Sequence, residues 1–183
     1  MNTQNHNDIF VFDMDNTLIK TDKANNLAYS EAIKSILGVN SNHCSNKRFT
    51  RTDLKELYPE LNQDQFDEII TRKERFFEAH LKDTELNDNL VCILKRLHKG
   101  GCRTILLTNS RSGRAISLCN YYNLTKYFDQ RFFYEDCDGK KYSLLKSLGY
   151  DLNNVVLFEN EEPPSTEALS SGIKLEKIIK IEF

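Results

Sequence analysis

Short apolar runs alternate with amphipathic stretches along most of the chain. In the amphipathic stretches, apolar residues recur every three or four positions, as they do on one face of an α-helix. The short apolar runs are typical of strands that are buried on both faces of a parallel sheet. They occupy residues 9–12, 104–107, 132–134 and 155–158, and a last apolar segment, residues 178–183, fits an edge strand. Strands that alternate with helices predict an α/β fold: a doubly wound, parallel, Rossmann-like sheet with helices on both faces.

Residues 20–85 interrupt this alternation, because they contain two helical patterns and no strand signal. The first pattern follows Asp22, which we expect to cap the helix, and it stops at Gly38. The second pattern follows Asn62, another favourable cap, and continues to about Leu81. This region is therefore predicted to be entirely helical.

The segment between the two helical patterns, residues 39–52, is polar and is predicted to be a loop. We expect two domains: an α/β core domain of residues 1–19 and 86–183, and a helical domain of residues 20–85. Ligand sites of open α/β sheets lie outside the carboxyl ends of the strands. A helical domain inserted after the first strand is therefore expected to cover that edge of the sheet as a cap.

Composition and charge narrow the class of protein. The chain has 183 residues, of which 39% are hydrophobic, enough for one core with a small insert. Its formal net charge of −2 gives no electrostatic reason to expect binding to nucleic acid or to an anionic membrane. No apolar run approaches the ~18 residues needed to span a bilayer. The first eight residues lack the apolar segment of a signal peptide, and the five scattered cysteines suit reduced thiols, so we expect a cytoplasmic protein.

Two carboxylates, Asp13 and Asp15, directly follow the first apolar run. Residues two apart point the same way along an extended chain, so both side chains can face one site. Carboxylates this close repel each other unless a cation or a shared proton compensates, which predicts a metal site. The alternative is a carboxylate pair on a solvated loop.

The stretch Ile9–Thr17, an apolar strand that runs into Asp-x-Asp-x-Thr, resembles the first motif of the haloacid dehalogenase-like (HAD) phosphohydrolase superfamily. Three later stretches resemble the other motifs of that superfamily, in the same order and on the same types of element: Leu106–Ser110, Asp138–Lys141 and Val155–Ile173. The resemblance covers the core segments, roughly residues 8–20 and 86–175. It implies a phosphatase of the HAD type with a small helical cap.

The resemblance implies phosphate-binding roles for residues in the second and third motifs. Thr108 would bind the phosphoryl group through its hydroxyl, and Asn109 follows it before a helix, where free backbone amides suit an oxyanion. The alternative for Thr108 is a simple helix cap. In the third motif, either Lys140 or Lys141 would supply the phosphate-binding ammonium, and the spacing of the family favours Lys141.

The fourth motif departs from the family pattern at its two acidic positions. The family normally has Asp at the first position and often Asp at the second, whereas this chain has Glu159 and Asn160. Glu159 is still a hard oxygen donor, on a side chain one methylene longer, and Asn160 provides a neutral oxygen. Glu161 or Glu162 could substitute for the missing acid. Alternatively, the acidic run merely begins a helix, where carboxylates favour the N-terminal dipole.

The mechanism that the resemblance implies is covalent. Asp13 attacks phosphorus and forms an aspartyl-phosphate, which water then hydrolyses. Asp15 protonates the leaving oxygen and later activates the water. Mg²⁺ would be held by Asp13, by the backbone carbonyl of Asp15 and by Glu159, and with the lysine and Thr108 it would stabilise the phosphoryl charge. Asp15 also argues against dehalogenase chemistry, because relatives that cleave carbon–halogen bonds lack this second Asp.

We therefore predict a Mg²⁺-dependent phosphatase that acts on a small phosphorylated metabolite, with a phosphomutase of the same intermediate as a close variant. The alternative is a degenerate relative that binds a phosphorylated ligand or a protein partner without turnover. In the helical domain, Arg48 and Arg51 either read the non-reacting part of the substrate or are simply solvated. The sequence names neither the substrate nor the oligomeric state.

Overall fold

The computed structural model describes residues 8–41, 47–137, 140–160 and 164–183. The chain divides into two compact units. One, here called the α/β unit, comprises the chain up to Ile19 and from Leu86 onward, and the other, the helical unit, comprises residues 20–85. The boundaries fall within two short strands that pair as a small sheet, β2 (Ile19–Lys20) and β3 (Glu85–Leu86).

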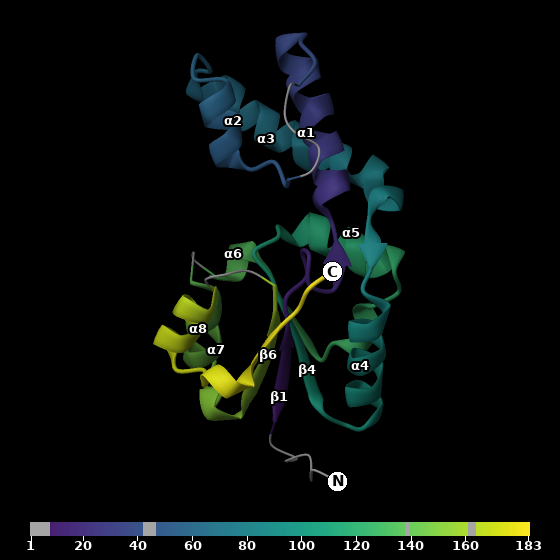
Figure 1. Ribbon diagram of the computed structural model, residues 1–183, viewed down its shortest axis with the longest axis vertical. Helices are drawn as coiled ribbons and strands as arrows, with labels where there is room; N and C mark the ends of the chain where they lie inside the picture. The colour runs from purple at the N-terminus through teal and green to yellow at the C-terminus, as the bar shows by residue number, and fades with distance from the viewer. Residues whose placement is uncertain (1–7, 42–46, 138–139, 161–163) are drawn as a thin grey trace. The chain divides into compact units, whose positions relative to one another are not determined.

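Five parallel strands form the central sheet of the α/β unit (Figure 1). In the order β5-β4-β1-β6-β7 across the sheet, they are Gln130–Phe132, Arg103–Leu107, Ile9–Phe12, Val155–Glu159 and Ile178–Lys180. β1 suits the central place because all four of its residues are apolar and buried. The predicted α/β fold with a parallel sheet is confirmed.

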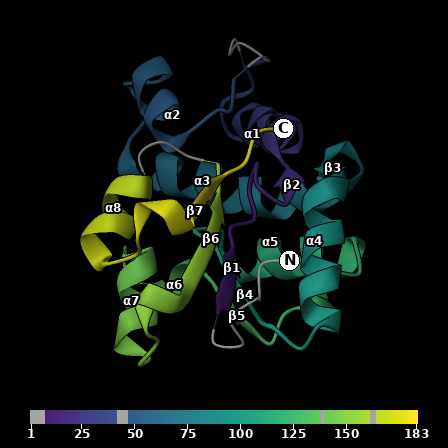
Figure 2. The same ribbon diagram turned by 60° about the horizontal axis from the view of Figure 1, so that its bottom comes forward.

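Helices cover both faces of this sheet, α4 and α5 on one side and α7 and α8 on the other, as two views show (Figure 1 and Figure 2). The α-helices of the described part of this unit are α4 (Asp88–Lys99), α5 (Ser112–Tyr121), α6 (Tyr134–Cys137), α7 (Lys141–Ser147) and α8 (Pro164–Ser171). Its 3₁₀ helices are η2 (Thr125–Tyr127), η3 (Leu152–Asn154) and η4 (Leu175–Lys177). The main apolar core joins β1, β4 and β6 to α7 and α8 through residues such as Val11, Ile105, Leu145, Leu157 and Ala168.

The register of the central strands brings three polar residues to one edge of the sheet. Phe12, the last residue of β1, pairs with β4 on one side and with Phe158 of β6 on the other. Asp13 and Glu159 therefore follow at the same level, and Thr108 comes directly after β4. The Phe12 and Phe158 rings stack with their centroids 4.6 Å apart directly before this edge. The polar residues at this edge therefore follow directly on tightly packed apolar side chains of the strands.

Two predicted strands differ in extent from the observed ones. The strand predicted at residues 132–134 lies at 130–132, because Tyr134 already begins α6. The edge strand predicted at residues 178–183 is present as β7, but it ends at Lys180. Neither shift changes the topology of the sheet.

In its described part, the helical unit consists of α1 (Asp22–Leu37), α2 (Arg51–Leu57), α3 (Gln63–Phe77) and the 3₁₀ helix η1 (Glu78–Asp83). A buried apolar cluster packs these helices together and includes Tyr29, Ile33, Leu54 and Ile69. α1 ends at Gly38 as predicted, with a φ of 71° that glycine adopts without strain. Asn62 caps α3 as predicted, through its side-chain oxygen.

Two details of the helical unit differ from the prediction. The segment predicted to be a loop, residues 39–52, contains the start of α2, whose first turn has a capping box between Thr50 and Asp53. Asp22 is the first residue of α1 and not its cap, because Thr21 occupies the cap position. For α2, the capping box defines the start of the helix more than apolar periodicity does.

Two further observations concern the described residues of both units. None of their helices is long and apolar enough to cross a membrane. Cys92, Cys102, Cys119 and Cys137 are free thiols.

Candidate active site

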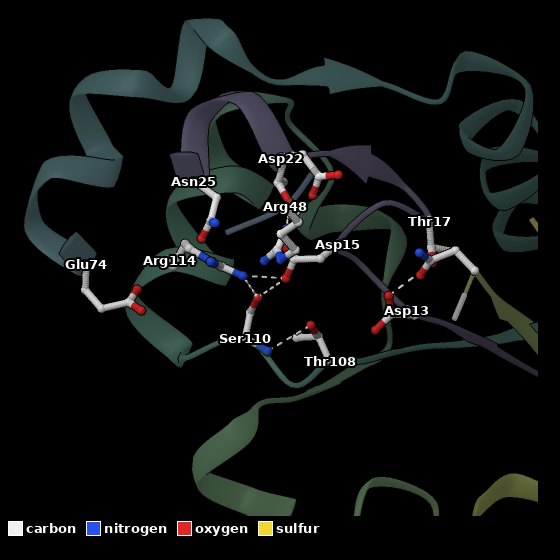
Figure 3. Close-up of polar contacts among 12 residues, drawn as sticks. Asp13, Asp15, Thr17, Asp22, Asn25, Arg48, Glu74, Thr108, Ser110 and Arg114 are labelled. Carbon is white, nitrogen blue, oxygen red and sulfur yellow. Dashed lines mark hydrogen bonds and ion pairs between the residues drawn. The ribbon is translucent and has the colours of Figure 1, made fainter. Parts of the chain in front are cut away.

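A tight turn after β1 carries Asp13, Asp15 and Thr17 at the sheet edge (Figure 3). The Met14 carbonyl accepts hydrogen bonds from three later backbone amides of the turn, at 3.0–3.3 Å. Asn16 has a φ of 56°, in the left-handed region that asparagine tolerates better than most residues. The turn therefore reverses the chain within a few residues and keeps both carboxylates near the end of the strand.

Asp13 is buried, with 6% of its surface exposed, and its two carboxylate oxygens have different partners. Oδ1 accepts a hydrogen bond from the Lys141 ammonium at 2.6 Å, and Oδ2 accepts one from the Thr17 hydroxyl at 3.1 Å. Burial raises the pKa of Asp13 to about 7 against the opposing effect of Lys141, and the nearby Glu159 adds to the rise. Asp13 is thus fixed in one orientation and poorly solvated, which suits a nucleophile.

Lys141 lies between two buried carboxylates and is itself buried. Its ammonium is 2.6 Å from Asp13 Oδ1 and 2.8 Å from Glu159 Oε2. Although burial lowers it, the pKa of Lys141 stays well above its ordinary value because both carboxylates favour the charged form. Lys140, directly before α7, is exposed. The structure therefore brings Lys141, and not Lys140, to the acidic edge of the sheet.

Glu159 is buried, and both of its carboxylate oxygens accept hydrogen bonds from protein groups. Oε2 accepts from Lys141 and from the Tyr142 hydroxyl, and Oε1 accepts from the Asn160 backbone amide at 3.0 Å. Tyr142 lies in the apolar core, and burial raises its pKa, so the hydroxyl keeps its proton and donates a hydrogen bond to Glu159. Glu159 thus gives Lys141 a second carboxylate partner besides Asp13.

Asp13 Oδ2 and Asn160 Oδ1 are two oxygens at the sheet edge that could hold Mg²⁺. Both lie within hydrogen-bond distance of the Thr17 hydroxyl, at 3.1 and 2.9 Å, so they are close to each other. Within the described residues, no group of three or more His, Cys, Asp or Glu side chains is arranged to hold a metal ion. Mg²⁺ commonly uses one or two carboxylates and completes its shell with water and substrate phosphate, so this pair fits a weakly held Mg²⁺. Glu161 and Glu162, the predicted substitutes, lie outside the described residues.

Asp15 has a different set of partners from Asp13. Its Oδ2 accepts a hydrogen bond from the Arg114 guanidinium at 2.5 Å and another from the Ser110 hydroxyl (Figure 3). Arg114 and Ser110 are both buried, whereas the Asp15 side chain keeps 18% of its surface exposed. Asp15 therefore retains access to solvent, as proton exchange with a substrate and with water requires.

Thr108 is buried at the end of β4, the strand next to β1. Its hydroxyl oxygen accepts a hydrogen bond from the Ser110 amide at 3.1 Å. Arg111 occupies the cap position of α5, so Thr108 is not the cap that the alternative interpretation made it. Asn109 is exposed at the same strand end. Phosphate binding by Thr108 and Asn109 stays a prediction.

The two candidate arginines of the helical unit have different environments within that unit. Arg48 donates to the Thr21 hydroxyl at 2.9 Å and pairs with the Asp22 carboxylate at 3.0 Å. Arg51 is exposed in the first turn of α2. Arg48 is therefore a guanidinium held by its own unit, and Arg51 is a surface cation. A role of either residue in substrate binding stays a prediction.

Three residues of this site were not predicted from the sequence: Ser110, Arg114 and Tyr142. A signal existed for Arg114, because it shares the buried face of α5 with Leu118, four residues later. A charged residue on a buried helix face needs a partner, which predicts a polar contact. Tyr142 carries no comparable signal, since a tyrosine on the apolar side of a short helix is usually part of the core.

A family model described as haloacid dehalogenase-like hydrolase matches residues 10–175, which span all four motifs. The chain belongs to the haloacid dehalogenase-like hydrolase family. The protein is therefore an enzyme of a hydrolase family, and the family resemblance of its motifs is confirmed. No curated protein matches the sequence.

Solved structures similar to this HAD-family hydrolase share its fold over most of their length. A HAD hydrolase of family IA, variant 3, from Entamoeba histolytica is 22% identical, with a TM-score of 0.73 over 90% of this chain and 81% of that chain. A predicted phosphatase from Clostridium acetobutylicum is 16% identical, with a TM-score of 0.76 over 94% and 83%. CbbY from Rhodobacter sphaeroides, in complex with phosphate, is 18% identical, with a TM-score of 0.72 over 96% and 86%. At these identities the likeness establishes the fold.

Proposed function

We propose that this hydrolase is a Mg²⁺-dependent phosphatase that acts on a small phosphorylated metabolite through an aspartyl-phosphate. The observation that supports this most strongly is the position of Asp13, whose carboxylate is fixed by Lys141 and Thr17 at the sheet edge. A buried carboxylate beside a fixed ammonium suits attack on a phosphoryl group, whose negative charge needs a cation. Asp15, two residues later, supplies the acid and base that such a two-step reaction requires.

The reaction divides into two displacements at phosphorus. In the first, a carboxylate oxygen of Asp13 attacks phosphorus, the bond from phosphorus to the leaving oxygen breaks, and Asp15 gives its proton to that oxygen. In the second, Asp15 takes a proton from water, whose oxygen attacks phosphorus and displaces the Asp13 carboxylate. Inorganic phosphate leaves, and both side chains return to their starting states.

Lys141 makes it less costly to bring an anionic phosphoryl group to an anionic nucleophile. Because Glu159 also holds the ammonium, at 2.8 Å, Lys141 stays in place while Asp13 reacts. Thr108, at the neighbouring strand end, would donate its hydroxyl to a phosphoryl oxygen, and the backbone at Asn109 would add an amide donor.

Mg²⁺, when bound, supplies positive charge that stabilises the phosphoryl oxygens. We propose that the Asp13 carboxylate, the Asp15 backbone carbonyl and the Asn160 amide oxygen hold it. The sequence prediction gives the third place to Glu159, whose Oε2 accepts from Lys141 and Tyr142, whereas the Asn160 oxygen lies beside the same Thr17 hydroxyl as Asp13 Oδ2. Mg²⁺ affinities of Glu159→Gln and Asn160→Leu, measured by calorimetry, distinguish the two assignments, because only loss of a true ligand should abolish binding.

We propose a small phosphorylated substrate, with the helical unit as its cap. CbbY, the relative crystallised with phosphate, supports a phosphorylated ligand at this kind of site. We expect Arg51 or Arg48 to contact the non-reacting part of the substrate. In that case Arg48→Ala or Arg51→Ala raises KM for the best substrate. Unchanged kcat/KM in both variants would contradict a role of these arginines in substrate binding.

We further propose a cytoplasmic enzyme without a nucleic-acid or membrane partner. The formal net charge of −2 offers no attraction to polyanions. The four described cysteines are free, which suits a reducing compartment.

The test of the proposed function is a screen of phosphorylated metabolites with the purified full chain, in Mg²⁺ and in EDTA. We expect phosphate release from at least one substrate in Mg²⁺ and less in EDTA, with Mg²⁺ held weakly by the site. Asp13→Asn is the matched control, because it keeps the shape of the side chain but removes the nucleophile. Release from no substrate, or equal release by Asp13→Asn, would contradict the proposal.

The competing function is binding of a phosphorylated ligand or protein partner without turnover. Asn160 favours it, because an amide in place of a carboxylate removes one charge that would attract Mg²⁺. Calorimetry of the wild-type protein with inorganic phosphate provides the discriminating measurement. Phosphate binding together with failure to hydrolyse any metabolite would support this second function.

A further inference from the structure

Arg114 is a buried cation that contacts Asp15, one of the two carboxylates on the turn after β1. It belongs to the first turn of α5, and only 6% of its side chain is exposed. Its guanidinium Nη2 lies 2.5 Å from Asp15 Oδ2 and also contacts the Ser110 hydroxyl. That hydroxyl contacts the same Asp15 oxygen, so each side chain of this three-residue cluster contacts the other two (Figure 3).

The segment that enters α5 brings two donors to one carboxylate oxygen. Ser110 lies two residues before α5 and Arg114 lies in its first turn, where the guanidinium contacts the Ser110 hydroxyl directly. Arg114 shares the buried side of α5 with Leu118, four residues later, so its side chain points into the α/β unit. Two neighbouring parts of the chain therefore hold the same oxygen of Asp15.

The turn that carries Asp15 has its own means of holding its shape. Hydrogen bonds from later amides to the Met14 carbonyl close it, and Asp15 forms a backbone bridge with Ile19. A buried guanidinium is costly to desolvate, and apolar residues of similar volume often stabilise a fold as well as a buried ion pair does. The cluster is therefore better explained by control of the Asp15 side chain than by stability of the turn.

We propose that Arg114 and Ser110 are positioning residues for the acid–base steps of Asp15, an inference that rests on the phosphatase function proposed for the site. Both donors hold Oδ2, which fixes the carboxyl group in one orientation. In the first displacement, the proton passes from the Asp15 carboxyl group to the leaving oxygen, and the resulting carboxylate lies beside the Arg114 guanidinium. In the second, the Asp15 carboxylate takes a proton from the attacking water. Arg114 and Ser110 neither gain nor lose a proton.

Leaving-group dependence separates positioning from a structural role. A p-nitrophenolate departs without a proton, whereas an alkoxide needs one as its bond to phosphorus breaks. We expect Arg114→Met to lower kcat/KM by about 10²-fold for an alkyl phosphate and by less than about threefold for p-nitrophenyl phosphate. Ser110→Ala should show the same selectivity with a loss of about tenfold. Equal losses for both substrates would mean that the cluster is structural and would overturn the proposal.

Arg103→Met is the matched control. Arg103 begins β4, at the end of that strand opposite the acidic edge, and its exposed guanidinium lies over the Tyr150 ring at 5.7 Å. Loss of an exposed arginine remote from the site should leave kcat/KM for both substrates within about twofold.

A double-mutant cycle tests whether Arg114 acts through Asp15. Addition of Arg114→Met to Asp15→Asn should cost no further activity toward the alkyl phosphate, although each single change lowers it. Additive losses would overturn the proposal. If Arg114→Met fails to fold, Arg114→Lys provides the measurement, because it keeps the charge but not the planar fork and should give a smaller, equally selective loss. If the wild type hydrolyses neither substrate, the phosphatase function fails and this inference with it, whereas unselective loss in an active enzyme removes the positioning role alone.

Discussion

Asp13 and Asp15 are two residues apart on one turn, yet their surroundings differ in almost every respect. Asp13 is buried between Lys141 and Thr17, and burial raises its pKa to about 7. Asp15 stays partly exposed and is held through one oxygen by Arg114. Carboxylates in such different environments can take different chemical roles, one bonding to phosphorus and the other moving protons.

The difference originates in the elements that supply the cations. Lys141 comes from α7, on one side of the central sheet, and Arg114 comes from α5, on the other side (Figure 1). Each cation brings its own network, since Lys141 also binds Glu159 and Arg114 also binds Ser110. A substitution in one network is therefore expected to leave the other in place.

Asp13→Asn should have the largest effect on turnover. We expect kcat to fall on the order of 10⁴-fold or more, because a carboxamide cannot replace the nucleophile. The loss should be the same for alkyl and aryl phosphates, since it does not depend on the leaving group. Phosphate-release assays with both substrate classes provide the measurement. Residual activity of more than a few per cent would remove Asp13 from the nucleophilic role.

The same two acids should differ in the sign of their effect on stability. Burial raises the pKa of Asp13 from the ordinary 3.8 to about 7, so the free energy of unfolding falls as the pH rises between these values. In EDTA at pH 8, Asp13→Asn should therefore raise the free energy of unfolding, by an amount that the loss of the ion pair with Lys141 reduces. Asp15→Asn should lower it by about 2 kcal/mol, because Arg114 loses the carboxylate with which it pairs. Urea unfolding of both variants provides the measurement. A change of the same sign in the free energy of unfolding of both variants would contradict the proposed difference between the two acids.

Asn160→Asp should strengthen the binding of Mg²⁺ beside Asp13. A second carboxylate beside Asp13 restores a negative charge, and we expect the dissociation constant of Mg²⁺ to fall by about tenfold. Calorimetric titration of the full chain measures this without reference to turnover. Glu159→Gln is the companion variant, and its effect should be smaller because Glu159 binds Lys141. If Glu159→Gln changed the dissociation constant of Mg²⁺ more than Asn160→Asp does, Glu159 would be the better candidate for a metal ligand.

Tyr142→Phe should have the smallest effect. It removes one hydrogen bond to Glu159, so Lys141 should be held less firmly and kcat/KM should fall by about three- to tenfold for alkyl and aryl phosphates alike. Tyr150→Phe is the matched control, because it removes a hydroxyl that contacts Gln130 at an exposed position. Wild-type kcat/KM in Tyr142→Phe would show that Glu159 fixes the lysine without this hydroxyl.

The fold could be predicted where apolar runs were long and sharply bounded, as in β1, β4 and β6. Edge strand β5 was misplaced because it begins with the exposed residues Gln130 and Arg131, which give no apolar signal. α2 was missed because it is short and polar, and the capping box between Thr50 and Asp53 defines its start more than any amphipathic face does.

Some residues of the candidate site could likewise be predicted from the sequence, and others could not. Asp13 and Thr108 could be placed together from the sequence, because the carboxyl ends of neighbouring parallel strands meet at one edge. Arg114 and Tyr142 reach that edge from helices, and their contacts depend on helix rotation and side-chain direction, which no spacing along the chain reveals. Lys141 was favoured over Lys140 by the family spacing, but its burial beside an exposed neighbour in sequence could not be predicted, because it depends on the rotation of α7.

The most direct test of the division between the two acids is acid quenching of Asp15→Asn during its reaction with p-nitrophenyl phosphate. The aryl group departs without a proton donor, whereas hydrolysis of the aspartyl-phosphate needs the base, so the intermediate should accumulate. Mass spectrometry of the quenched protein should then find one phosphoryl group on the peptide that contains Asp13. Steady turnover without a phosphorylated peptide, or a phosphoryl group on any other residue, would contradict these roles of Asp13 and Asp15.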